Sequence, residues 1–127
     1  MIIYRVQNSA GAGPYTSGWH PPSTKSNVFI NDVHPDPYDD DLLFAFLENK
    51  NIYDFKFAFY SLKQASEWIN GWSNVSIHEL SDVKFKFYSL EIDSDDVIAG
   101  EKQCIYHKNS TIEIINSVPL MEIYNEN

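Results

Sequence analysis

The sequence is short of cysteine and of basic residues. Cys104 is the only cysteine among 127 residues, so neither an intramolecular disulfide nor a cysteine-rich metal site can form within the chain. Nine Lys and Arg residues stand against 18 Asp and Glu residues, which gives a net charge of −9. Because a chain with so few cations has no basic patch, we expect no direct binding to nucleic acid or to an anionic membrane.

Long apolar stretches are also missing. No apolar run in the sequence approaches the ~20 residues that a transmembrane helix needs. Residues 1–9, MIIYRVQNS, lack the basic segment followed by an apolar segment that marks a secretory signal. With one cysteine and neither kind of segment, the chain is expected to work in a reducing cytoplasm.

The common motifs of nucleotide binding and hydrolysis do not occur. The sequence contains no Walker-type loop, no G-x-G-x-x-G and no G-x-S-x-G. The four histidines lie far apart, without an H-x-x-x-H spacing, so we expect no metal site. Cys104 has apolar neighbours within a predicted strand, which indicates a core thiol rather than a nucleophile.

Aromatic residues are abundant, with eight Phe, eight Tyr and three Trp. The segment FKFAFYSLKQASEWI, residues 55–69, shows how they are used. Phe55, Phe57 and Phe59 alternate with other residues, which predicts a strand with one face in the core. Ser61 and Gln64 then form the S-x-x-Q pattern of a capping box, so a helix is expected to begin there. Its predicted apolar face comprises Leu62, Ala65, Trp68 and Ile69.

Similar patterns predict an α+β fold and a single domain over residues 1–127. About six short strands, in an antiparallel or mixed sheet, are expected at 2–6, 55–60, 83–92, 104–107, 111–115 and 118–124. Two or three short helices are expected at 41–48, 62–70 and 74–80. Residues 8–37 hold several Gly and Pro residues with aromatic side chains between them, so we predict a long ordered loop with a brief strand at 27–30.

Two acidic clusters are candidate cation sites. The first comprises Asp36, Asp39, Asp40 and Asp41, and it either caps the helix that follows or holds a hard cation. The second comprises Glu91, Asp93, Asp95 and Asp96. It lacks the ligand periodicity of an EF-hand loop, so we interpret it as a solvated turn.

The order of the elements resembles the minimal layout of ADP-ribosyltransferase-like domains. The resemblance rests on Arg5 in the first strand, on Ser61 before a helix, and on a late strand that opens with Glu101-Lys102-Gln103. It implies NAD as cofactor, with Arg5 on an NAD phosphate and Ser61 beside the nicotinamide ribose. Glu101 and Gln103 would occupy the catalytic E-x-E or Q-x-E motif. The implied cleft is also lined by Tyr15, His34 and Tyr38.

Gln103 is neutral where that motif has its catalytic glutamate. A carboxylate stabilises the oxocarbenium-like state of NAD cleavage, and an amide does not. The resemblance therefore leaves two readings open. Either Glu101 supplies the charge, or the domain binds a nucleotide without catalysing transfer.

The chain also resembles a set of small phage-encoded proteins. The shared segments are Tyr4-Arg5, Gly11–Tyr15, His34–Asp40, Phe57–Trp68 and Gly100–Gln103. This resemblance implies a phage or mobile-element accessory protein that acts in the host bacterial cytoplasm.

Two main hypotheses follow. In the first, an ADP-ribosyltransferase-like domain, active or degenerate, acts on a host factor. In the second, an acidic, non-enzymatic protein inhibits a host defence or nucleic-acid-handling complex by docking on its basic surface. Both imply a host protein as partner, while a phage assembly component is a third reading. The residues do not determine the oligomeric state.

Overall fold

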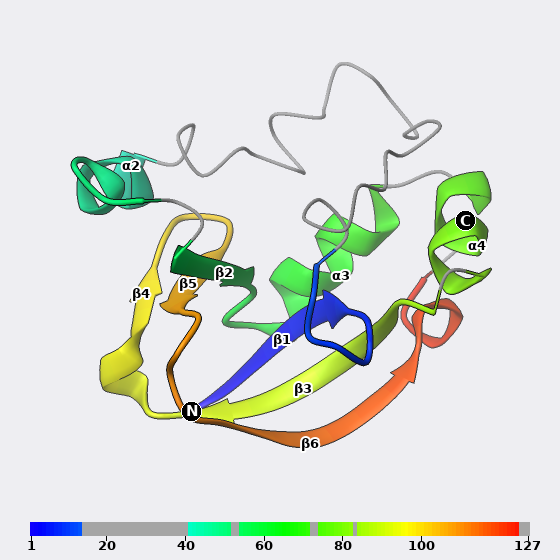
Figure 1. Cartoon of the computed structure of the whole chain (residues 1–127). Coiled ribbons are helices and arrows are strands. Elements are labelled where there is room, and N and C mark those ends of the chain that lie inside the picture. The colour runs from blue at the N-terminus through cyan, green and yellow to red at the C-terminus, as the bar shows by residue number, and fades with distance from the viewer. Residues whose placement is uncertain (14–40, 52–53, 72–73, 83, 125–127) are drawn as a thin grey trace.

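In the described residues, six strands form two three-stranded antiparallel sheets rather than the single sheet predicted (Figure 1). The structure is a computed structural model that describes residues 1–13, 41–51, 54–71, 74–82 and 84–124. The larger sheet has the order β1-β3-β6 and the smaller one β2-β5-β4. The strands are β1 (Ile2–Gln7), β2 (Phe55–Ala58), β3 (Lys86–Ile92), β4 (Val97–Ala99), β5 (Cys104–His107) and β6 (Ile112–Pro119).

Three α-helices and two 3₁₀ helices complete the described part of the chain, which confirms the predicted α+β class. They are α2 (Asp41–Leu47), α3 (Leu62–Asn70), α4 (Asn74–Asp82), η5 (Ser94–Asp96) and η6 (Leu120–Glu122). None of these helices has the length and apolarity that crossing a bilayer requires. The prediction of one domain over 1–127 stays a prediction, because much of 8–37 lies outside the described residues.

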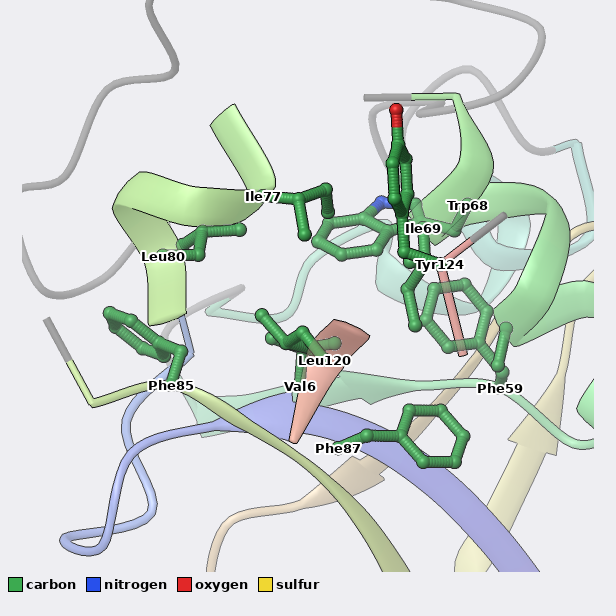
Figure 2. Close-up of a cluster of buried hydrophobic side chains, with 11 residues drawn as sticks. Val6, Phe59, Trp68, Ile69, Ile77, Leu80, Phe85, Phe87, Leu120 and Tyr124 are labelled. Carbon is green, nitrogen blue, oxygen red and sulfur yellow. The ribbon is translucent and has the colours of Figure 1, made fainter. Parts of the chain in front are cut away.

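Helices α3 and α4 cover one face of the larger sheet (Figure 2). Val6 and Phe87 point from the sheet toward these helices, because they alternate with residues that face the other way. Trp68 and Ile69 of α3 and Leu80 of α4 meet them in this core. Full burial of each such side chain contributes about 1.5–3 kcal/mol to stability.

The opposite face of the larger sheet meets the smaller sheet. Ile3 and Leu90 pack there against Ala58 and Cys104, which come from β2 and β5. The outer face of the smaller sheet is covered by α2, whose Leu43 and Leu47 cluster with Ile105. The described residues are therefore layered as helices, larger sheet, smaller sheet and helix, with the β1 side chains at positions 3, 5 and 7 facing the smaller sheet.

The capping box at Ser61 is confirmed. The Ser61 hydroxyl accepts a hydrogen bond from the Gln64 backbone N–H at 3.1 Å, and Gln64 Oε1 accepts one from Tyr60 N at 3.1 Å. Helix α3 occupies the predicted range, and Ala65, Trp68 and Ile69 are buried as expected. Leu62 was predicted on the apolar face but is 52% exposed, since it lies in the first turn, beyond the edge of the core.

The prediction that Phe55, Phe57 and Phe59 share one core was wrong. Strand β2 ends at Ala58, and Phe59 instead forms an antiparallel bridge with Tyr4 of β1. Phe55 and Phe57 pack under α2, whereas Phe59 enters the helix-side core beside Trp68, at 5.8 Å between ring centroids. The chain passes here from the smaller sheet to the larger one. The alternating phenylalanines therefore lie in two different cores.

The last third of the chain differs from the prediction at two points. Residues 111–115 and 118–124 were expected to form two strands, but β6 runs unbroken to Pro119, and η6 follows it. A register shift between Ser89 and Leu90 of β3 accommodates the extra residue of β6. Strand β4 was not predicted. The strand expected at 27–30 lies outside the described residues.

Candidate functional site

Arg5 points from β1 into the space between the two sheets and is 6% exposed. Its Nε donates to Gln7 Oε1 at 3.0 Å, its Nη1 donates to the Phe57 carbonyl oxygen, and its Nη2 lies 3.4 Å from the Gly11 carbonyl oxygen. Burial lowers the pKa of the guanidinium from its ordinary value. All three acceptors are neutral oxygens.

A second cation, Lys56, lies beside Arg5. Lys56 Nζ donates to the Gly11 carbonyl oxygen at 3.1 Å, so the two side chains converge on one acceptor. The pKa of Lys56 is lowered, first by burial and second by the Arg5 charge. The Lys56 side chain is half-buried, so solvent reaches this region next to Lys56.

Tyr106 of β5 faces the same space, since it is paired with Lys56 of β2. Its side chain is 1% exposed, and its hydroxyl has no hydrogen-bond partner among the described residues. Burial raises the pKa of this hydroxyl, while the nearby Arg5 charge partly lowers it. We call Arg5, Lys56 and Tyr106 together the Arg5 cluster.

A glycine turn closes over the Arg5 cluster. Asn8 Oδ1 accepts from the backbone N–H groups of Ala10 and Ala12, each at 3.0 Å, which fixes the turn. Gly11 has a φ of +84°, and a Cβ there would lie 3.2 Å from Lys56 Nζ. A Cβ at Gly13 would lie 3.0 Å from Arg5 Nη2. Glycine thus permits the backbone to approach both cations closely.

The residues on either side of Ser61 contact the Glu101 turn, whereas the Ser61 side chain does not. Gln64 Nε2 and the Tyr60 hydroxyl both donate to the Glu101 carbonyl oxygen, at 3.2 and 3.4 Å. The Glu101 side chain is exposed, whereas Gln103 is 8% exposed. The Ser61 hydroxyl is engaged in the helix cap.

The predicted residues do not all converge in one place. Within the described ranges, no hydrogen bond joins Arg5 to Ser61, Glu101 or Gln103, since Arg5 bonds to Gln7, Phe57 and Gly11 instead. Tyr15, His34 and Tyr38 lie outside the described residues, as do Asp36, Asp39 and Asp40.

The described part of the chain contains no side chains arranged for metal binding or for thiol chemistry. No group of three or more His, Cys, Asp or Glu side chains there is placed to hold a metal ion. Cys104 is fully buried, and burial raises its pKa to about 12. A thiol with that pKa stays protonated at neutral pH, which agrees with the predicted core role.

A charged surface forms where β3 ends and β6 begins. Glu91 and Glu113 are directly opposite each other on these antiparallel strands, and both are exposed. Asp93, Asp95 and Asp96 follow at once and are exposed too. We call these five residues the acidic end. The sequence shows four of them as a cluster, but Glu113 joins them only through the strand register.

A family model with the description Bacteriophage T4 Y00F protein matches residues 1–120. The chain belongs to this family. The Y00F match extends over all six described strands, and it confirms the predicted resemblance to phage-encoded proteins. No curated protein and no solved structure matches the chain in the corresponding comparisons. The resemblance to ADP-ribosyltransferase-like domains therefore stays a prediction.

Proposed function

We propose that this phage protein acts by binding, and that its acidic end docks on a basic surface of a host protein. The observation that carries the proposal is the pair formed by Glu91 and Glu113. Like charges directly opposite each other in neighbouring strands destabilise a sheet. The positive charges of a basic partner would attract both carboxylates and so offset this repulsion.

The surroundings of the pair increase the negative potential. Asp93 Oδ1 accepts from Asp95 N at 3.0 Å, which orders the turn that presents Asp95 and Asp96 to solvent. The N-terminal ammonium group, 3.2 Å from Glu91 Oε1, is the one cation within ion-pair distance of these carboxylates among the described residues. An acidic surface of this kind steers basic partners and accelerates their association at low salt.

Affinity capture from a bacterial lysate at two salt concentrations tests the proposal. The immobilised chain should retain a basic protein at about 50 mM salt and release it at about 500 mM, because screening weakens contacts between exposed charges. Mass spectrometry identifies the retained protein, which is then purified for direct binding. Retention of only acidic or neutral proteins, or retention that salt does not change, contradicts docking through the acidic end.

A second candidate function is NAD-dependent ADP-ribosyl transfer. It is supported by the contact between the capped start of α3 and the Glu101 turn. The neutral Gln103 and the neutral contacts of Arg5 favour binding over catalysis. Labelled NAD incubated with the chain and a bacterial lysate tests transfer. A signal lost in Glu101→Gln and kept in Glu122→Gln supports the enzyme, and the absence of any signal removes it.

A further inference from the structure

We propose that Arg5, Lys56 and Tyr106 form a binding site for a small oxyanion of the phosphate class. This site is separate from the acidic end and does not depend on the proposed docking. It lies between the two sheets, beneath the Gly11 turn and next to the half-buried Lys56.

The charge balance of the Arg5 cluster is the first argument. Arg5 and Lys56 donate to the same carbonyl oxygen, yet neither has a carboxylate partner among the described residues. A buried cation is costly unless it is paired, and two neighbouring cations repel each other as well. A bound oxyanion would offset both the lost hydration and the repulsion.

The count of donors is the second argument. A guanidinium has five N–H groups and an ammonium has three. The structure uses three donors of Arg5 and one of Lys56 within the described residues. The Tyr106 hydroxyl is buried and has no partner there. Arg, Lys and hydroxyl donors together suit the oxygens of phosphate, and Arg can bind two of them at once.

The glycine turn is the third argument. Because residues 11 and 13 lack a Cβ, the backbone comes within contact of Lys56 Nζ and Arg5 Nη2. The turn places one carbonyl oxygen between the two cations, which partly neutralises them in the absence of a ligand. If the Arg5 cluster were purely structural, it would need no further donor, whereas the Tyr106 hydroxyl has no hydrogen-bond partner among the described residues.

Phosphate-dependent thermal unfolding tests the site. The melting temperature is measured with inorganic phosphate and, separately, with ADP, against sodium chloride at equal ionic strength. We expect phosphate to raise the melting temperature in a saturable manner, as a ligand of the folded state does. A larger shift with ADP at equal concentration identifies a nucleotide phosphate, and a shift with phosphate alone identifies the free ion. The absence of a shift with either probe overturns the proposal.

Two pairs of variants locate the effect. Tyr106→Phe removes a hydroxyl without a described partner, so the ligand-free melting temperature should stay equal or rise, while phosphate affinity falls about tenfold. Tyr60→Phe, on the exposed Tyr60, should keep the wild-type affinity. Lys56→Gln should lose most of the shift, and Lys63→Gln, on the exposed face of α3, should keep it. An unchanged phosphate shift in both Tyr106→Phe and Lys56→Gln overturns the site even if phosphate binds elsewhere.

Discussion

Glu91 of β3 and Glu113 of β6 are register partners with exposed carboxylates on neighbouring strands. The N-terminal ammonium group contacts Glu91, and Glu113 has no ion pair within the described residues. The pair therefore weakens the larger sheet and strengthens the negative potential of the acidic end. Stability and partner binding should respond in opposite directions when its charge is changed.

Glu113→Lys should stabilise the isolated chain. Lysine opposite Glu91 replaces a repulsive cross-strand pair with an attractive one, so the free energy of unfolding should rise by about 0.5–1 kcal/mol. Urea unfolding at low salt measures the change. Glu122→Lys, at an exposed position in η6, is the matched control and should change stability by less. A Glu113→Lys variant no more stable than this control contradicts the repulsion.

Ser61→Ala should destabilise the chain through the start of α3. The substitution removes the acceptor for the Gln64 N–H, and loss of such a cap costs about 1 kcal/mol. Chemical denaturation measures the loss. Ser61→Asp retains a capping oxygen and should preserve most of the stability. If the Ala and Asp variants unfold at the same denaturant concentration, the cap is not what stabilises this helix end.

Gly11→Ala should also destabilise the chain. Alanine at a φ of +84° costs roughly 1–2 kcal/mol, and its Cβ would lie 3.2 Å from Lys56 Nζ. Asparagine tolerates this left-handed backbone better, so Gly11→Asn should lose less of the free energy of unfolding. Thermal unfolding of the two variants measures the difference. Equal losses would show that the backbone conformation does not limit this turn.

Cys104 should make stability fall at high pH. Its folded pKa is about 12 against an ordinary value of 9.0, so between these values the unfolded chain loses a proton that the folded chain retains. The free energy of unfolding should therefore decline by about 1.4 kcal/mol per pH unit in that window. Urea unfolding between pH 8 and about 10.5 follows the decline. Cys104→Ala should be less stable at pH 8 but show a flatter slope, and parallel slopes would contradict a shifted thiol.

Local patterns predicted the elements that local interactions determine. The Ser61 capping box, the extent of α3 and the strand Cys104–His107 all follow from neighbouring residues. The two-sheet arrangement does not, because the alternating phenylalanines give no sign that Phe59 leaves one sheet for the other. Asn116 and Ser117 fall between two predicted strands, yet pairing with β3 keeps them in β6. Tertiary pairing overrides local preference there.

The candidate site, like the fold, could be predicted from the sequence only in part. The sequence indicates that Arg5 is unusual, since it has apolar neighbours in a short strand. It does not indicate that Lys56 shares the Gly11 carbonyl oxygen, because this depends on how distant segments pack. Glu113 likewise joins the acidic end only through strand register. Contacts of this kind need the three-dimensional arrangement.

Docking through the acidic end is tested most directly with two triple variants of equal charge. One carries Glu91→Gln, Asp95→Asn and Glu113→Gln, and the other carries Glu48→Gln, Glu67→Gln and Glu122→Gln at exposed positions elsewhere. Both change the net charge from −9 to −6. Titration calorimetry with the captured host protein at low salt should show affinity reduced at least tenfold for the first variant and nearly unchanged for the second. Equal affinities for the two variants would contradict a docking role for the acidic end.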